Sequence, residues 1–427
     1  MNKSPECGGR GFAAALSLLA LGAALCARAA PSAIAQTPFG DGLADYSKTE
    51  DTSSVARLQQ RLDQGEARLG FNPFYGYLLD VLNELKVSPC SQLLVFSRSS
   101  AQREAISTTT TRAVYFNEQT YITWIPGSPT LEISAVDPKL GAVFYTLEQK
   151  ETRQPRFTRS DRCLECHTAA VTSGVPGFLV RSLVTDEHGV PDLNRGLSLV
   201  THATPLAERW GGWYVCGAPG SLLHRGNLVG ATTGERSEPD SEWAGGLTGL
   251  GRFFDLCRYP EPTSDIVALL VLEHQVHLQN LLTRLRYEAT RELARGDDLS
   301  RLKPLTEAVV RYLLFAEEAP LSTPVKGVSD FTRWFESQGP ADQQGRSLRQ
   351  FDLRARLFKY PCSYLIYSEA FDKLPREVKL QIYRRLWLRL TGDDGDPAFR
   401  HIPAETKQAI VDILIETKPD VPVYWKL

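Results

Sequence analysis

The chain has 427 residues, of which 42% are apolar and 23% are charged, a composition typical of globular proteins. The formal net charge of −2 argues against a broad basic surface, and therefore against nucleic acid as a partner. This length allows two domains or one large domain.

Residues 1–35 have the pattern of a secretory signal peptide. Lys3 and Arg10 make the start positive, residues 12–25 are apolar but too few to span a bilayer, and two A-x-A cleavage sites follow. An uncleaved membrane anchor is the alternative. We expect cleavage, a periplasmic or secreted location, and no stable membrane insertion afterwards. No later stretch reaches the roughly 18 apolar residues that a membrane-spanning helix needs.

The first part of the mature chain predicts an α+β fold. Helical spacing of apolar residues predicts helices over 55–64 and 75–85. After Pro89 the segments become short, β-branched and aromatic, and turn residues separate them, so we expect a mostly antiparallel sheet. The expected strands are 93–96, 113–116, 121–124, 131–136 and 142–145.

Residues 163–167 read Cys-Leu-Glu-Cys-His, and this motif carries the main functional prediction. A C-x-x-C-H stretch is the pattern of covalent haem attachment of the c type. Each thiol adds across one porphyrin vinyl group, and the adjacent histidine binds the iron. We therefore expect one haem c, bound covalently by Cys163 and Cys166, with His167 as the proximal iron ligand. The loop that holds the motif, 152–172, is rich in Arg and Thr and lies between strand-like segments, in contrast to the helical setting of a small cytochrome c.

Other uses of a C-x-x-C pair are weaker here. A zinc site usually shows a second ligand pair at finger-like spacing, and none follows. A redox dithiol favours a thioredoxin-like strand–helix setting, which the polar flanks do not suggest. Residues 163–167 resemble the haem-attachment motif of c-type cytochromes. A zinc-binding structural exported protein remains the minor alternative.

The rest of the chain changes from strands to helices. Further strands are expected at 178–181 and 213–215, with a turn around His188. From Ser264 the pattern is helical, beginning with a long helix over 265–294 that ends at Gly296. The Gly-rich segment 230–250 connects a haem-binding domain, 36–235, to a helical domain or layer, 250–427. The other expected helices are 305–318, 330–337, 347–358, 376–391 and 404–417.

The second axial ligand of the iron is open. The chain contains one methionine, Met1, so a cleaved leader excludes methionine ligation. His202 and His224 flank a Trp- and Gly-rich segment, 208–215, and His274 lies in the apolar stripe of the long helix. These three histidines are the candidate distal ligands. Each has a plainer alternative as a buried, hydrogen-bonded core residue.

Two further assignments depend on surrounding residues. Arg209 and Arg225 are candidates to pair with the haem propionates, because a guanidinium matches a carboxylate. Four cysteines outside the motif and leader could form disulfides after export, although a domain of this size does not need them and free thiols are the favoured state. They are Cys90, Cys216, Cys257 and Cys362.

Residues 208–215, 224–227 and 360–368 resemble stretches of exported bacterial single-haem proteins of uncharacterised function. The resemblance covers most of the mature chain and implies haem binding without an established substrate. Two functions follow from the motif. One is electron transfer with a redox partner protein through a bis-histidine haem. The other is an open-site haem that acts on a small oxidant, either as an enzyme of the oxidoreductase class or as a sensor.

Overall fold

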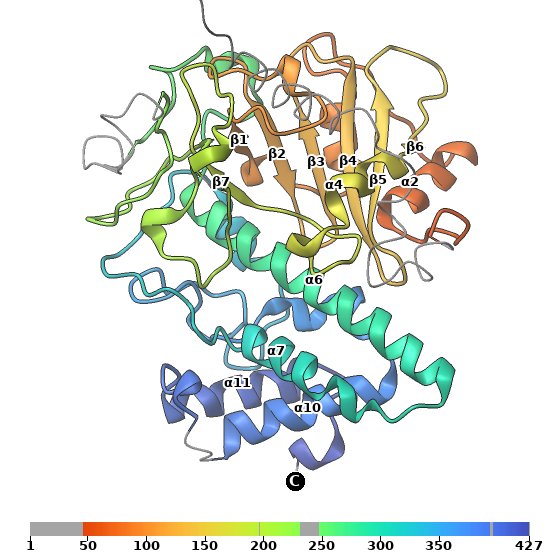
Figure 1. Ribbon diagram of the computed structural model, residues 1–427, viewed down its shortest axis with the longest axis vertical. Coiled ribbons are helices and arrows are strands. Elements are labelled where there is room, and N and C mark those ends of the chain that lie inside the picture. The colour runs from red at the N-terminus through yellow and green to blue at the C-terminus, as the bar shows by residue number, and fades with distance from the viewer. Residues whose placement is uncertain (1–45, 196, 231–246, 393–395, 427) are drawn as a thin grey trace, which may run out of the picture.

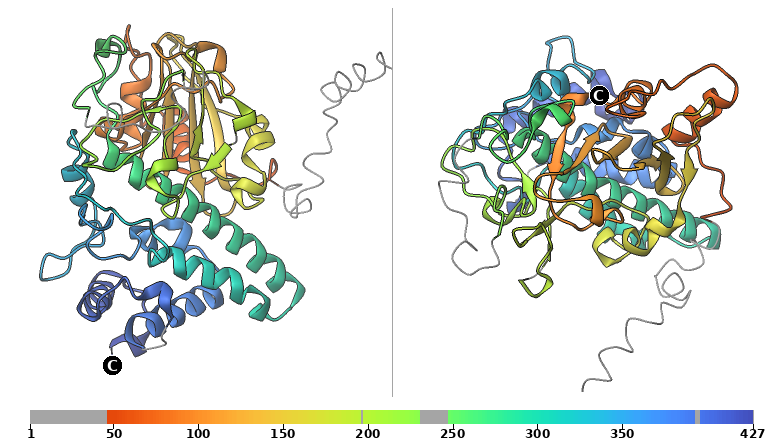
Figure 2. Two further views of the ribbon diagram at one scale, coloured as in Figure 1. Left: turned by 60° about the vertical axis from the view of Figure 1, so that its left-hand side comes forward. Right: turned by 90° about the horizontal axis from the view of Figure 1, so that it is seen from above.

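The computed structural model describes residues 46–195, 197–230, 247–392 and 396–426. The predicted signal peptide and most of the predicted connection 230–250 lie outside these residues. Figures 1 and 2 show a sheet, one long helix along its end, and a layer of C-terminal helices beyond that helix. The predicted α+β class, with an antiparallel sheet followed by helices, is confirmed.

The sheet has seven strands in the order β6-β5-β4-β3-β2-β1-β9, and every neighbouring pair is antiparallel. Strands β1 to β5 match the five predicted segments to within three residues at each end. β9 returns after the motif to complete the edge next to β1. The strands are β1 (Leu93–Val95), β2 (Arg112–Phe116), β3 (Thr120–Trp124), β4 (Thr130–Asp137), β5 (Gly141–Glu148), β6 (Thr158–Arg159) and β9 (Trp213–Tyr214).

One face of this sheet is covered by the N-terminal helices α2 (Ser54–Asp63) and α3 (Leu78–Glu84). Ser53 caps α2 and also bonds the Tyr145 hydroxyl at 3.0 Å, which fixes the helix to β5. The residues of β4 alternate strictly between buried and half-buried. This alternation shows that the helix-covered face is packed and the other face is more open.

The long helix α6 (Ile266–Arg295) is the centre of the core. Asp265 caps it, because the Asp265 carboxylate accepts the Val267 N–H at 2.8 Å. Gly296 ends it in the left-handed conformation, as the sequence predicts. Most of the first twenty residues of α6 are buried, since the sheet lies on one side and helices lie on the other.

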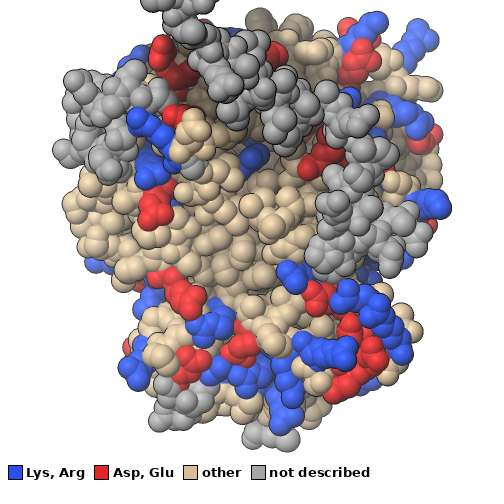
Figure 3. Space-filling model, in the orientation of Figure 1, with Lys and Arg blue, Asp and Glu red and all other residues tan. Residues whose placement is uncertain are grey.

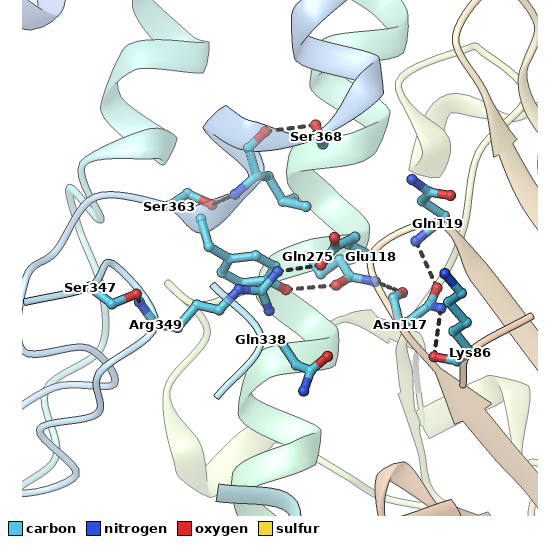
Figure 4. Close-up of polar contacts among 12 residues, drawn as sticks. Lys86, Asn117, Glu118, Gln119, Gln275, Gln338, Ser347, Arg349, Ser363 and Ser368 are labelled. Atoms are coloured by element: carbon cyan, nitrogen blue, oxygen red, sulfur yellow. Dashed lines mark hydrogen bonds and ion pairs between the residues drawn. The ribbon is translucent and has the colours of Figure 1, made fainter. Parts of the chain in front are cut away.

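A polar seam joins α6 to the sheet and to the C-terminal layer (Figure 4). The Gln275 side chain donates to the Asn117 carbonyl at 2.7 Å and accepts from the Tyr364 hydroxyl at 2.6 Å. Arg349 forms an ion pair with Glu118 in the β2–β3 turn, and its guanidinium lies over the Tyr364 ring. Sheet, helix and C-terminal segment therefore meet in one hydrogen-bonded network.

The C-terminal helices pack on the side of α6 away from the sheet (Figure 1). The helix predicted over 305–318 ends at Leu313, because Phe315 and Glu317 have positive φ angles. The helix predicted over 347–358 is wrong. Phe351 pairs instead with Phe358 as a β-bridge, and the two rings stack at 5.2 Å. The helices are α7 (Lys303–Leu313), α8 (Phe331–Glu336), α9 (Glu369–Asp372), α10 (Arg376–Thr391) and α11 (Ala404–Thr417).

A separate two-stranded sheet pairs β7 (Arg181–Leu183) with β8 (Leu197–Leu199). The predicted strand 178–181 begins three residues later, because the backbone of Phe178 bonds the side chain of Asn280 rather than a neighbouring strand. His188 lies in the predicted turn between β7 and β8.

Candidate functional site

The C-x-x-C-H motif folds as a helical turn on the more open side of the sheet. A 3-10 turn, Asp161–Cys163, leads into α4 (Leu164–His167), and the Thr168 N–H bonds the Leu164 carbonyl at 2.9 Å to close the turn. The motif does lie between strands, β6 and β7, as the sequence predicts, but the expectation of a non-helical setting is wrong. Figure 1 shows α4 in front of β4 and β5.

The helical turn places both thiols on one side. Cys163 and Cys166 are three residues apart, a spacing that brings side chains together on a helix. Cys166 is exposed and Cys163 is half-buried, and both are free thiols. Burial raises the pKa of the Cys163 thiol, and the nearby Glu132 carboxylate adds to the effect. Both sulfur atoms therefore lie on the same side of this turn.

His167 is oriented through one ring nitrogen. Its Nδ1 lies 2.9 Å from the Gly177 carbonyl oxygen, so Nδ1 carries the proton and donates it. The ring packs against Phe144 of β5 with centroids 4.7 Å apart. Burial lowers the pKa of His167 to about 4, so the imidazole is neutral near pH 7. Nε2 then carries a lone pair, the state in which imidazole binds iron.

Asn280 of α6 fixes the carbonyl that orients His167. Its amide accepts the Phe178 N–H at 2.9 Å and donates to the Phe178 carbonyl at 2.9 Å. A Cβ added to Gly177 would lie 2.4 Å from the Asn280 Oδ1 atom, closer than real Cβ contacts come. The central helix therefore sets the position of the motif histidine through two side-chain hydrogen bonds and a glycine that permits close approach.

The candidate distal ligands His202 and His274 lie against each other, fully inside the core. Their Nδ1 atoms are 2.9 Å apart, His202 Nε2 lies 3.3 Å from the Ala316 carbonyl, and His274 Nε2 lies 2.8 Å from the Ser363 hydroxyl. Burial lowers the pKa of His202 to about 3 and that of His274 well below its ordinary value. With neutral rings, one consistent chain of donors runs from Ser363 through His274 and His202 to Ala316.

His224, the third candidate, is also buried. Its Nδ1 accepts the Gly226 N–H at 3.1 Å, and its ring meets Trp210 edge-on with centroids 5.2 Å apart. Burial lowers its pKa to about 4. Within the described ranges, no hydrogen bond or ring contact joins His167 to any of the three candidates, so the structure brings His202 and His274 together but not with the motif.

The arginine predicted for propionate binding at position 209 has a different partner. Arg209 forms a buried ion pair with Glu273 of α6, and it also donates to the carbonyls of Thr204 at 2.7 Å and His202 at 2.9 Å. The Trp210 indole donates to the same carboxylate at 3.1 Å. Burial raises the pKa of Glu273 to about 7 although Arg209 opposes this rise. The tryptophan-rich segment 208–215 thus packs as ordinary core at Trp210.

Across the part of the chain that the structure describes, no group of three or more His, Cys, Asp or Glu residues is placed to hold a metal ion. A zinc site at Cys163 and Cys166 would lack its further ligands there. The four cysteines Cys90, Cys216, Cys257 and Cys362 are free thiols, as favoured from the sequence. Among the described residues, no helix is long and apolar enough to cross a membrane.

Comparisons with models of protein families, with curated proteins and with solved structures found no match to this chain.

Sequence reasoning missed the residues that support His167. Gly177 lies ten residues after His167 and directly follows Pro176. This Pro-Gly pair is the one local signal that could have indicated a role for Gly177. Phe144 and Asn280 belong to distant elements, and no local pattern points to either residue.

Proposed function

We propose that this chain is an exported c-type haem protein that carries one covalent haem and performs one-electron redox chemistry. Cys163 and Cys166 would form the thioether links, with each sulfur bonding a vinyl carbon and each thiol hydrogen going to the other carbon of that vinyl group. His167 would bind the iron through Nε2. A bound haem supplies the redox couple, and the chain supplies the ligand, its orientation and its surroundings.

The hydrogen bond from His167 Nδ1 to the Gly177 carbonyl carries this proposal. It fixes the tautomer that leaves Nε2 as an electron-pair donor, and it resists rotation of the ring. A metal-bound histidine almost always donates its other N–H to a carbonyl or carboxylate, which also raises its basicity. The two accessible thiols within one helical turn complete the set of groups that c-type attachment requires.

A second candidate is an open, five-coordinate haem that acts on a small oxidant. One observation favours it over a bis-histidine electron carrier whose second ligand is His202 or His274. Both ring nitrogens of His202 and of His274 already have partners inside the core, so either residue would have to break this chain to bind iron. Breaking buried hydrogen bonds costs about 1–3 kcal/mol for each group left unpaired.

The test is to produce the full chain in a host that attaches c-type haem. We expect the mature protein to gain the mass of one haem, retained after denaturation, and to lose it when Cys163 and Cys166 are both replaced by Ala. Cys257→Ala is the matched control, because Cys257 is also an exposed free cysteine. A colourless product with the mass of the bare polypeptide would contradict the proposal.

The reduced spectrum separates the two candidates. A low-spin spectrum that carbon monoxide does not change would indicate two strong protein ligands and favour electron transfer. A high-spin spectrum that responds to carbon monoxide would indicate an open site.

A further inference from the structure

The motif and Arg112 lie on the more open face of the seven-stranded sheet, and Arg181, at the start of β7, lies over the edge of that sheet near Arg112. In antiparallel strands, residues directly opposite each other point to the same face. Phe144, which contacts His167, is opposite Ser134, and Ser134 is opposite Tyr121. These side chains define the face on which the motif lies.

The next row of this face is polar and only partly covered. Thr146 is opposite Glu132, Glu132 is opposite Thr123, and all three are half-buried. The Thr123 hydroxyl donates to the Glu132 carboxylate at 3.2 Å. Thr123 is opposite Val114, which places Arg112, two residues before Val114 on β2, on the same face. A partly open strip therefore extends from the motif toward Arg112.

A second arginine is held beside Arg112. Arg112 is opposite Val95, and Val95 is opposite Trp213. The Trp213 indole N–H donates to the Arg181 carbonyl at 2.8 Å, which places the start of β7 over this edge of the sheet. The Arg181 guanidinium lies near enough to Arg112 to lower the pKa of Arg112, although burial is the larger cause. Figure 3 shows few charged side chains over the middle of the side that carries α4.

Neither arginine has an anionic partner. Among the residues described, no ion pair or side-chain hydrogen bond involves Arg112 or Arg181, and the Arg112 Nε atom is buried without a partner. Burial lowers the pKa of Arg112, and the Glu132 charge opposes this. Arg112 and Arg181 are half-buried, whereas the buried Arg209 and Arg349 each form an ion pair, with Glu273 and Glu118. A buried guanidinium N–H without a partner is costly, and a carboxylate bound at Arg112 Nε would remove that cost.

We propose that Arg112 and Arg181 bind the two propionate carboxylates of a haem attached at Cys163 and Cys166. This inference rests on the proposed haem function. Haem brings two carboxylates, and the strip between the motif and the arginines contains the half-buried side chains of Thr146, Glu132 and Thr123. The arginines hold the carboxylates ionised and place positive charge near the iron, which favours the reduced state because that state carries one positive charge fewer.

The test compares Arg112→Gln, Arg181→Gln and the double variant with wild type, all as full-length proteins that carry attached haem. Arg162→Gln is the matched control, because Arg162 is exposed and immediately precedes Cys163. We expect every protein to retain the covalent haem by mass. Each single variant should lower the reduction potential by at least three times the shift of the control, and the double variant should lower it most.

A second measurement reads the carboxylates directly. With haem labelled with carbon-13 at the propionates, infrared titration should give a higher carboxylate pKa in Arg112→Gln and Arg181→Gln than in wild type. Arg112→Lys, which keeps the positive charge, should recover most of the potential and serves if Arg112→Gln does not fold.

Potentials and propionate pKa values equal to those of the control would overturn the arginine assignment while leaving haem attachment intact. A wild-type protein without haem would instead overturn the proposed function.

Discussion

Histidine occupies two contrasting settings in this protein, one on the open face of the sheet and one between α6 and the C-terminal helices. His167 bonds the Gly177 carbonyl through Nδ1, and its Nε2 has no hydrogen-bond partner among the described residues. His202 and His274 use both nitrogens, in a chain that includes Ser363 and Ala316. Burial lowers the pKa in both settings, although His167 is half-buried and the other two histidines are buried. Exposure and an unbonded ring nitrogen together therefore distinguish His167 from the histidine pair in the core.

The largest expected effect concerns the buried ion pair between Arg209 and Glu273, in which Arg209 also bonds the His202 carbonyl. Arg209→Met would leave the Glu273 carboxylate buried without its partner, and we expect it to reduce the free energy of unfolding by about 3–5 kcal/mol. The double variant Arg209→Met, Glu273→Leu should lose less, because no charge is left unpaired. Arg333→Met is the control, since the Arg333–Asp330 pair is exposed and should contribute about 0–1 kcal/mol. Urea denaturation measures each value.

The next largest effect is expected for the hydrogen-bonded pair His202 and His274. His274→Ala removes a fully buried ring and leaves Ser363 and His202 each without one partner, so we expect a loss of about 2–4 kcal/mol. His188→Ala, at an exposed turn, should change stability by less than about 0.5 kcal/mol.

If His274 is structural, the haem spectrum of His274→Ala will match that of wild type. A change from low spin to high spin in this variant would identify His274 as the distal ligand. The distinction between His167 as a ligand and His274 as a structural residue would then be wrong.

Acid should weaken the buried histidines. A group whose pKa is lower in the folded state stabilises the protein fully above its unfolded pKa, near 6.5 for histidine, and loses this contribution as pH falls toward the folded value. For His202, with a folded pKa of about 3, the loss between pH 7 and pH 5 is roughly 2 kcal/mol, since one pKa unit corresponds to about 1.4 kcal/mol. We expect His202→Gln to show that much less pH dependence than wild type in urea unfolding.

Glu273 acts with the opposite sign. Burial raises its folded pKa to about 7, above the ordinary 4.5, so its contribution falls as pH rises between these values. The free energy of unfolding of Glu273→Gln should therefore fall more steeply than that of wild type as the pH is lowered from 7 to 5.

If His202→Gln and wild type have parallel stability curves from pH 5 to pH 7, His202 does not become charged on unfolding in this range.

The smallest expected effect concerns the motif setting. Gly177→Ala would place a Cβ against Asn280 and move the carbonyl that orients His167, so we expect a shift in reduction potential with attachment of the haem retained. Gly249→Ala is the matched control, because its added Cβ meets nothing within 4 Å. Equal potentials in the two variants would show that the Gly177 carbonyl does not tune the iron.

Local sequence patterns predicted much of the fold. Short β-branched and aromatic segments separated by turn residues located β1 to β5, and the apolar stripe with Gly296 located α6 and its end, because these signals depend on neighbours along the chain. The pattern failed at 347–358, where the Asp352 carboxylate accepts the N–H groups of Ala355 and Arg354 and holds a tight turn instead of a helix. It also failed at α4, whose single turn is too short for any periodicity.

The sequence by itself determined the C-x-x-C-H motif, the three-residue spacing of Cys163 and Cys166, and the lack of any methionine after Met1. Only the tertiary structure decided which histidine nitrogens are occupied and which arginines lack an anion. The reason is physical: C-x-x-C-H chemistry is complete within five residues, whereas His202 meets His274 and Arg112 approaches Arg181 through contacts about seventy residues apart in the chain. Such contacts arise from packing of α6 and the sheet, which no short stretch encodes.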